Sequence, residues 1–290
     1  MSQGRLAIIA GHGFLPRYLA EAARAAGDDP LVILLNNEAE DRFEDFPTEP
    51  MGIADIGRFS GLLKSYSIDR VVLSGGVRRR PDWREIRPTF RTLKQLPKIV
   101  RALSRGGDDA LLRAAMGIIE AEGCRVIGAH DIAPNLLMRL GPIGRHVPAE
   151  EDLRDIMRAA EAALKLGELD IGQGAVSVGG RVVALEGVEG TDRMLERVAS
   201  LRAEGRISKR RRGVLVKLCK PQQDMRADLP TIGPSTVESA LKAGLAGVAV
   251  EAGRALVLEE AALVAAADAA GLFICGIDPL EPKLGLDATT

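Results

Sequence analysis

Charged side chains are concentrated in the segment from residue 217 to residue 236, which reads KLCKPQQDMRADLPTIGPST. It starts where a predicted buried strand ends and stops where a predicted helix begins, with Ser235 or Thr236 as the expected helix cap. A long loop that carries five charges at a strand end is unusual for a simple connection. The five are Lys217, Lys220, Asp224, Arg226 and Asp228. The segment therefore predicts either a ligand site or a structural network of ion pairs.

The charges of this segment are suited to a metal ion and a phosphate group. A carboxylate about 4 Å from a phosphate is opposed by about 4 kcal/mol at a protein-like dielectric constant. A divalent cation removes that repulsion and can activate water or polarise the phosphoryl group. Asp224 and Asp228 are hard oxygen ligands for Mg²⁺ or Mn²⁺, with Asp224 as metal ligand or water activator and Asp228 in support. Lys217, Lys220 and Arg226 would neutralise a diphosphate and stabilise its charge as a bond breaks.

A second polar segment, EGVEGTD at 186–192, joins a predicted strand to a predicted helix. Glu189 could bind a metal or handle a proton, and Asp192 is a further candidate for substrate binding. Thr191 is a candidate for substrate binding and also the expected helix cap, and capping with surface charge is an equally open interpretation of this segment. The glycines on either side of Gln173 would let a ligand approach the backbone. Thr236 completes the candidate substrate-binding residues of the second half.

Two glycine turns follow predicted strands in the first half, GHG at 11–13 and SGGV at 74–77. Backbone amides at a strand-to-helix turn favour an anion. The third glycine of the dinucleotide fingerprint is missing, so a plain tight turn is equally open. Two such turns at the carboxyl edge of one parallel sheet would define a crevice where ligands bind. We therefore expect His12, Gly75 and Gly76 to contact a nucleotide or nucleotide sugar.

The elements that must position these residues alternate between strand and helix in the first half, which predicts a parallel sheet with helices on its faces. The expected strands lie at 6–10, 31–35, 71–73 and 125–127, and the helices at 15–26, 59–66 and 108–122. A segment rich in glycine and proline follows, at 140–148. We expect a Rossmann-like nucleotide-sugar-binding domain over 1–143 and a catalytic α/β domain over 144–290.

The second half predicts a mixed α/β domain with some antiparallel pairing. Gly179 and Gly180 separate two short strands, which is a good signal for a hairpin. The expected strands lie at 175–178, 182–186, 214–218, 248–250, 255–258 and 272–277. The expected helices lie at 150–166, 191–204, 235–243 and 259–270.

Composition restricts the classes of function. Of 290 residues, 46% are hydrophobic and 27% charged, which is typical of a soluble globular protein. Aromatic residues make up only 3%, which argues against stacking on single strands, and we expect no nucleic-acid partner. The three cysteines lie in apolar runs, which indicates buried free thiols in a reducing cytoplasm. We expect no signal peptide and no membrane span.

Basic residues form three local groups. The segment 87–105 has apolar residues at near-helical spacing with arginine and lysine between them, which predicts a basic amphipathic helix. Such a helix could contact an anionic membrane surface or pack on the sheet with its basic face in water. The clusters at 78–80 and 209–212 are either solvated loops or phosphate contacts.

These segments together resemble the LpxI-type UDP-2,3-diacylglucosamine pyrophosphatases of lipid A biosynthesis, from about residue 6 to residue 277. The stretch 217–238 is highly specific, whereas the glycine turns alone are not. The matching segments read GHGFLP, SGGVRRRPDW, GDDALLR, DIGQGAV, ALEGVEGTDRML, VLVKLCKPQQDMRADLPTIGPSTVE and AGLAGVAVEAG.

The resemblance implies a two-domain hydrolase with its substrate cleft between the domains. It implies hydrolysis of UDP-2,3-diacylglucosamine to UMP and 2,3-diacylglucosamine 1-phosphate, called lipid X. Water would attack the sugar-linked phosphorus with magnesium required, and the essential aspartate would fall on Asp224. A cytoplasmic enzyme with a lipid substrate would meet the inner membrane surface transiently as a peripheral protein, and a homodimer is left open.

Two alternatives belong to other classes. A nicotinamide-dependent oxidoreductase would use the turn at His12. The missing third glycine counts against it, as do Asn36 and Asn37 where an acidic residue is expected. A non-catalytic nucleotide-sugar sensor would use the same crevice without hydrolysis. No GxSxG motif and no Walker loop occur, so a serine hydrolase or a P-loop ATPase is not expected.

Overall fold

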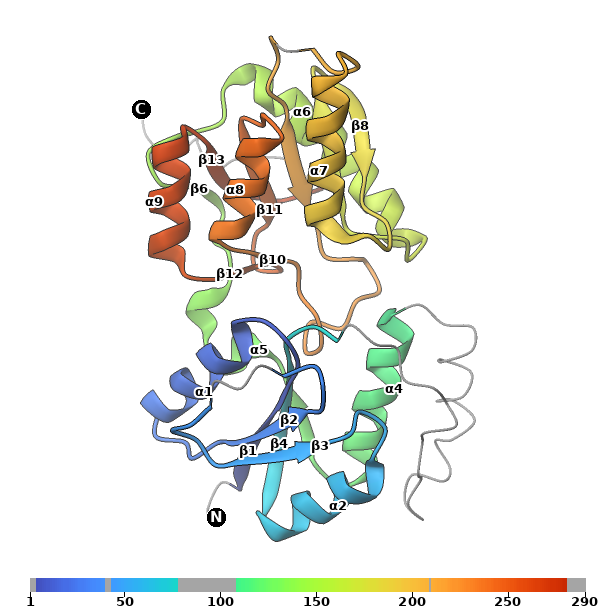
Figure 1. Ribbon diagram of the computed structural model, residues 1–290, viewed down its shortest axis with the longest axis vertical. Helices are drawn as coiled ribbons and strands as arrows, with labels where there is room; N and C mark the ends of the chain where they lie inside the picture. The colour runs from blue at the N-terminus through green and yellow to red at the C-terminus, as the bar shows by residue number, and fades with distance from the viewer. Residues whose placement is uncertain (1–3, 40–42, 78–107, 209, 281–290) are drawn as a thin grey trace. The chain divides into compact units, whose positions relative to one another are not determined.

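The computed structural model describes residues 4–39, 43–77, 108–208 and 210–280 (Figure 1). The chain forms two compact units. The first comprises Met1–Pro134 with Asp224–Asp228, and the second comprises Asn135–Gln223 with Leu229–Thr290. The short piece from Asp224 to Asp228 therefore belongs to the first unit, although the residues on both sides of it belong to the second. The basic segments predicted at 87–105 and 78–80, and Lys209, lie outside the described residues.

The first unit is a parallel five-stranded sheet in the order β3-β2-β1-β4-β5, with helices packed against it. This confirms the predicted Rossmann-like arrangement, and the strand order reverses between β1 and β4. The strands are β1 (Arg5–Ala10), β2 (Leu31–Leu35), β3 (Thr48–Met51), β4 (Ile68–Ser74) and β5 (Arg125–Ile127). The helices are α1 (Leu15–Ala25), α2 (Ile56–Ser65), α4 (Asp108–Ala121) and α5 (Ala129–Ile132).

Strand burial explains which elements the sequence predicted. Strands β1 and β2 are almost wholly buried, as expected for parallel strands covered on both faces. The missed strand β3 reads TEPM and is mostly exposed at the edge of the sheet. Its Pro50 lacks a backbone donor, which an edge strand tolerates.

The second unit has a mixed six-stranded sheet in the order β6-β13-β11-β9-β7-β8. Strands β9, β11 and β13 are parallel, while β6 and β7 run antiparallel to their neighbours. The strands of this unit are β6 (Gly141–Ile143), β7 (Gly174–Val178), β8 (Arg181–Leu185), β9 (Val214–Lys217), β10 (Thr231–Ile232), β11 (Gly247–Glu251), β12 (Leu256–Val257) and β13 (Phe273–Ile277). The helices are α6 (Glu150–Glu168), α7 (Gly190–Ala203), α8 (Pro234–Lys242) and α9 (Glu260–Ala270).

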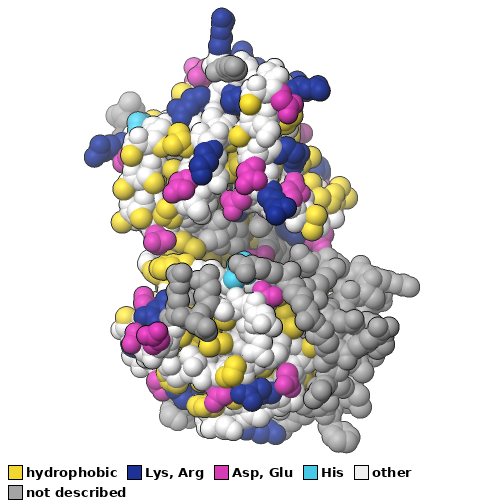
Figure 2. Space-filling view, in the orientation of Figure 1, with side chains coloured by type: hydrophobic (Ala, Val, Ile, Leu, Met, Phe, Trp, Pro, Cys, Tyr) yellow, Lys and Arg dark blue, Asp and Glu magenta, His cyan; other side chains and the backbone are white. Residues whose placement is uncertain are grey.

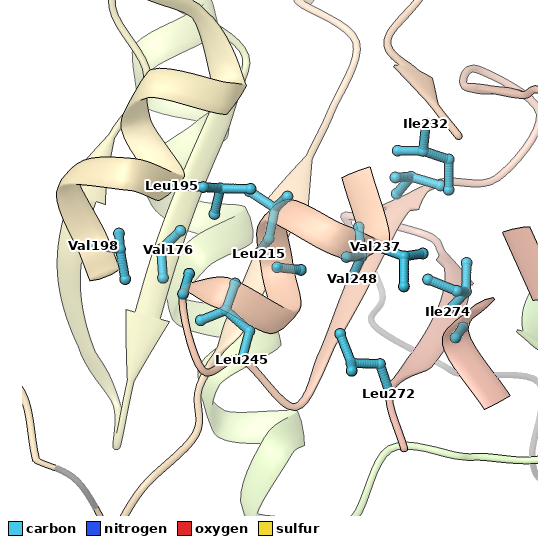
Figure 3. Close-up of a cluster of buried hydrophobic side chains, with 14 of the residues drawn as sticks. Val176, Leu195, Val198, Leu215, Ile232, Val237, Leu245, Val248, Leu272 and Ile274 are labelled. Atoms are coloured by element: carbon cyan, nitrogen blue, oxygen red, sulfur yellow. The ribbon is translucent and has the colours of Figure 1, made fainter. Parts of the chain in front are cut away.

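Each face of this sheet carries its own core. Helix α6 packs through Ile156, Ala159 and Ala163 on the face formed by Val214 and Val216. Helices α7, α8 and α9 cover the opposite face. Figure 3 shows part of that second core, to which Val176, Leu195, Leu215, Val237 and Val248 contribute. Alternate residues of one strand therefore face different helices.

The predicted Gly179–Gly180 hairpin is confirmed, because β7 and β8 pair antiparallel on either side of it. Both glycines have positive φ, at +65° and +78°, which favours glycine. The buried carboxylate of Asp155 on α6 accepts hydrogen bonds from Ser177 Oγ at 2.6 Å and from the Gly179 and Gly180 amides at 2.8 and 2.6 Å. Asp155 therefore joins helix α6 to the hairpin.

The predicted burial of Cys124, Cys219 and Cys275 as free thiols is confirmed. Burial raises the pKa of the Cys275 thiol to about 12, so this thiol stays protonated and unreactive at neutral pH. Among the helices within the described ranges, none is both long enough and apolar enough to cross a membrane.

The hairpin contacts predict that Asp155→Ala lowers the free energy of unfolding by about 3 kcal/mol, because the buried Ser177 hydroxyl and two partly buried glycine amides lose their acceptor. Urea denaturation measures this change. The control Glu161→Ala removes an exposed carboxylate that pairs with Arg158 on the same helix, and should change stability by less than about 0.5 kcal/mol. Equal effects of the two variants would contradict the role given to Asp155.

Candidate functional site

The two glycine turns of the first unit meet at the carboxyl edge of its sheet. The Gly11 amide donates to the Ser74 carbonyl at 2.8 Å, the His12 amide to the Gly76 carbonyl at 2.9 Å, and the Gly76 amide to the His12 carbonyl at 3.0 Å. The ends of β1 and β4 are therefore joined directly at the point where the strand order reverses.

Glycine is required where these two turns meet. Gly75 has a φ of +84°, and a Cβ on Gly76 would overlap the ring of His12. Two polar atoms in or beside these turns, His12 Nδ1 and Ser74 Oγ, are buried without a hydrogen-bond partner among the described residues. The edge thus offers a ligand two polar atoms that have no partner among the described residues.

Lys217 is the most unusual charge in the second unit. It ends β9, lies on the same face as Leu215, and is only 7% exposed. Its Nζ donates to the Thr231 carbonyl at 3.1 Å. Within the described part of the chain, no carboxylate lies within 4.0 Å of that nitrogen. A buried ammonium is costly unless an anion accompanies it, so this position is suited to a phosphate.

The residues after Lys217 are fixed to the second unit by side-chain contacts. The Cys219 amide donates to Glu251 Oε2 at 2.9 Å, and Gln222 Nε2 donates to the Gly167 carbonyl at 2.8 Å. Lys220 Nζ forms an ion pair with Asp170 Oδ1 at 2.7 Å. The charge of Lys220 is therefore balanced within the unit, unlike that of Lys217.

Asp224 and Arg226 lie in the first unit and bind each other. Asp224 Oδ1 accepts from the Arg226 amide and Nε at 3.0 Å each, and Oδ2 accepts from Nη2 at 2.7 Å. Arg226 also pairs with Glu120 on α4 at 2.9 Å, and Ala227 packs on the core of this unit. The Arg226 guanidinium is the main cause that lowers the pKa of Asp224 below its ordinary 3.8, and Arg113 adds to the effect.

The donor set around Asp224 limits how a metal could bind. No three histidine, cysteine, aspartate or glutamate side chains in the described ranges are grouped so that they could hold a metal ion. Both oxygens of Asp224 accept hydrogen bonds from Arg226. Mg²⁺ is often held by one or two carboxylates together with substrate phosphates. Asp224 and Asp228 fit such a site only if phosphate oxygens complete it and Arg226 releases Asp224.

The candidate residues of the segment 186–192 hydrogen-bond to protein groups that the sequence did not predict. Thr191 does not cap α7, because Glu189 is the N-cap residue and the Thr191 hydroxyl donates to Glu186 Oε1 at 2.9 Å. Glu189 pairs with Arg197 at 2.8 Å, and its pKa is lowered first by its own backbone amide and then by that arginine. Asp192 Oδ1 accepts from Ser239 Oγ at 3.5 Å.

The predicted cap of α8 is also wrong. Gly233 is the N-cap residue, and its amide donates to Thr236 Oγ1 at 3.2 Å. Thr236 therefore completes the helix start from inside the first turn, where an accepting side chain can satisfy the N-cap amide.

Seven of the predicted site residues fall into three groups. His12, Gly75 and Gly76 share the carboxyl edge of the first sheet. Gln173 and Lys217 share the carboxyl edge of the second, where the Leu218 amide donates to the Gln173 carbonyl at 2.9 Å. Asp224 and Arg226 form the third group, with Glu120.

Sequence reasoning missed Asp170, Glu120 and Glu186 as site residues. Asp170 and Glu186 are the first residues of two segments that it singled out, DIGQGAV and EGVEGTD, but neither was chosen as a candidate. Glu120 gave no signal, because it occupies an ordinary position of a predicted helix.

Comparison with known proteins places this two-unit α/β chain in a family. The LpxI N-terminal domain family matches residues 5–136, and the LpxI C-terminal domain family matches residues 139–275. The UDP-2,3-diacylglucosamine pyrophosphatase LpxI of Caulobacter vibrioides is 44% identical over 279 residues, which cover 96% of this chain and 99% of that protein. The chain therefore belongs to the LpxI family, and the resemblance drawn from its motifs is confirmed.

Solved structures add little to this assignment. The Bordetella bronchiseptica enzyme WbmH in complex with NAD⁺ has a TM-score of 0.25 at 18% identity, over 40% of this chain and 36% of that one. The Thermus thermophilus UDP-glucose 4-epimerase in complex with NAD has a TM-score of 0.31 at 14% identity, over 96% of this chain and 94% of that one. Such low scores support no argument about fold or function.

The contacts of Asp224 predict how its pKa depends on Arg226. Carbon-detected NMR of the aspartate carboxyls should give Asp224 a pKa below 3.8 in the unaltered protein. Arg226→Ala should raise that pKa, because the side-chain hydrogen bonds and the charge of Arg226 that lower it are removed. The stabilisation from this pair should be present above about pH 4 and be lost as pH falls through the lowered pKa. A low Asp224 pKa that persists in Arg226→Ala would contradict this account, and Arg158→Ala is the control.

Proposed function

We propose that this chain hydrolyses the diphosphate of UDP-2,3-diacylglucosamine to UMP and 2,3-diacylglucosamine 1-phosphate, in lipid A biosynthesis. The observation that carries the proposal is the buried Lys217 ammonium, which has no carboxylate within 4.0 Å among the described residues. A diphosphate supplies the missing anion. The Caulobacter vibrioides relative supports the choice of substrate, because its name states this activity and nearly its whole length is matched.

The proposed reaction adds water to the sugar-linked phosphorus. The bond from that phosphorus to the bridging oxygen breaks, and UMP leaves with the bridging oxygen. Lys217 binds a phosphate oxygen in a water-poor position, where a charge-assisted hydrogen bond is strong. Arg226 exchanges Asp224 for a phosphate oxygen when substrate binds. Lys220 remains in its pair with Asp170 and supports the loop.

We further propose that Asp224 binds magnesium or manganese, with Asp228 in support and phosphate oxygens completing the site. The ion would supply charge neutralisation and a more acidic water molecule. His12, Gly75 and Gly76 would contact another part of the nucleotide sugar. The lipid substrate also implies transient contact of this cytoplasmic, peripheral enzyme with the inner membrane surface.

The role of Lys217 predicts that replacing this residue lowers activity without lowering stability. Replacing a buried charge by an apolar side chain of similar length is often neutral or stabilising by about 1–3 kcal/mol. Lys217→Met should therefore unfold at the same or a higher urea concentration, yet lose at least about 100-fold in kcat/KM for UMP release. Lys242→Met, an exposed lysine on α8, is the control and should keep normal activity. Near-normal turnover by Lys217→Met would refute the proposed anion site.

The role of Asp224 is tested by metal removal and by mutation. Purified protein with UDP-2,3-diacylglucosamine and magnesium should release UMP, and EDTA should abolish the release. Asp224→Ala and Asp224→Asn should each lower kcat by at least about 1000-fold while far-UV circular dichroism shows a folded protein. Binding of the nucleotide sugar without release by the unaltered protein would indicate a sensor and contradict the hydrolase. Turnover that survives Asp224→Ala would show that the roles are assigned wrongly.

A further inference from the structure

Glu186 is a buried carboxylate that uses only half of its hydrogen-bonding capacity. It follows β8 directly and is 7% exposed. Its Oε1 accepts from the Thr191 hydroxyl at 2.9 Å. Its Oε2 is buried and has no donor among the described residues. Buried polar atoms in native proteins nearly always have a partner, so Oε2 points to a donor that the described protein atoms do not supply.

The carboxylate occupies space that only a glycine leaves open. The Glu186 amide donates to the Gly174 carbonyl at 2.9 Å, which continues the pairing of β8 with β7. A Cβ on Gly174 would overlap Glu186 Oε2. The side chain therefore lies flat over Gly174 at the carboxyl edge of the second sheet.

Glu186 and Lys217 flank Gly174 on one face of the sheet. Gly174 pairs with Lys217 on β9, and β7 lies between β8 and β9. Ala184, Val176 and Leu215 lie two residues before or after Glu186, Gly174 and Lys217 respectively, and all three belong to one core cluster. Figure 3 labels Val176 and Leu215. Since side chains alternate along strands, Glu186, Gly174 and Lys217 share the face covered by α7 and α8.

The two buried charges do not neutralise each other. Among ion pairs within 4.0 Å in the described residues, none joins Glu186 to Lys217. Gln173, the residue before Gly174, also carries a buried acceptor, Oε1, with no donor in the described part of the chain. The Lys217 cation and the unused Glu186 acceptor on one face are complementary to a ligand that carries an anion and a nearby O–H or N–H group. A nucleotide sugar has that chemistry.

We propose that Glu186 is a substrate-binding residue that accepts a hydrogen bond from a hydroxyl or N–H group of the nucleotide sugar whose phosphate binds Lys217. This inference rests on the proposed function and names a contact within it. A purely structural role would need only one acceptor for Thr191, which a neutral side chain could provide. Burial of a whole carboxylate with one oxygen unused is explained by a ligand donor.

The test compares Glu186→Ala, Glu186→Gln and Gly174→Ala with the unaltered protein. Glu186→Ala should raise KM by about 10- to 100-fold and change kcat by less than about threefold, because a hydrogen bond to a charged group made in ground and transition state alike is lost. Gly174→Ala should raise KM in the same direction without changing any charge, because its methyl group displaces Oε2. Glu196→Ala, an exposed carboxylate on α7, is the control and should leave both constants unchanged.

The variant Glu186→Gln distinguishes two roles of this side chain, accepting a hydrogen bond and transferring a proton. Its carbonyl can accept from the ligand while its amide donates to the Thr191 hydroxyl, so most of the lost affinity should return. If Glu186→Gln is as defective as Glu186→Ala and the loss falls on kcat, the carboxylate moves a proton and the proposal is overturned. Calorimetric titration with UMP and with 2,3-diacylglucosamine 1-phosphate locates the donor. Weaker binding of UMP alone by Glu186→Ala places it on ribose or uracil, and weaker binding of the sugar phosphate alone places it on the glucosamine.

The outcomes distinguish this inference from the proposed function. If the unaltered protein releases UMP but Glu186→Ala and Gly174→Ala keep its KM, the binding role of Glu186 is refuted while the hydrolase stands. Water would then be the partner of Oε2. If the unaltered protein neither releases UMP nor binds either product, the proposed function fails, and the inference fails with it.

Discussion

The ammonium group of Lys217 lies at the end of β9 with a backbone carbonyl as its protein partner and without a carboxylate nearby in the described residues. Much of the second unit serves to keep it there. Strand β9 is buried between α6 on one face and α7, α8 and α9 on the other. Because water is largely excluded, the charge is unfavourable alone and strongly attractive to an anion. The unfavourable free energy of such a buried charge can be retained in a protein when a bound ligand offsets it.

The charged residues that follow Lys217 are divided between the two units. Residues up to Gln223 are fixed to the second unit, Asp224–Asp228 belong to the first, and Leu229 begins the return to the second. Within each unit most of these charges have a partner, Lys220 with Asp170 and Arg226 with Asp224. Exposed charges elsewhere are mixed, and Figure 2 shows acidic and basic side chains interspersed on the visible face of the second unit. The charge of Lys217, which has no ion-pair partner among the described residues, is therefore distinctive because of its burial.

Sequence patterns predicted the fold where burial or backbone conformation leaves a local trace. Apolar runs predicted β1 and β9, and the glycine pair predicted the β7–β8 hairpin. The edge strand β3 was missed because half-exposed strands with proline lack an apolar run. Both predicted caps were wrong, since Thr191 and Thr236 hydrogen-bond to groups other than those that a cap would satisfy.

The site was predictable in residue type and only partly in arrangement. The charged loop at 217–236 was identified, but the pairing of Arg226 with Glu120 spans 106 positions and depends on tertiary packing. Glu186 was overlooked for a related reason, since its importance comes from burial over Gly174. The most direct measurement of the central claim is a crystal structure of the unaltered protein with UDP and magnesium. The account predicts a phosphate oxygen within about 3.2 Å of Lys217 Nζ. UDP bound with its phosphates remote from Lys217 would contradict it.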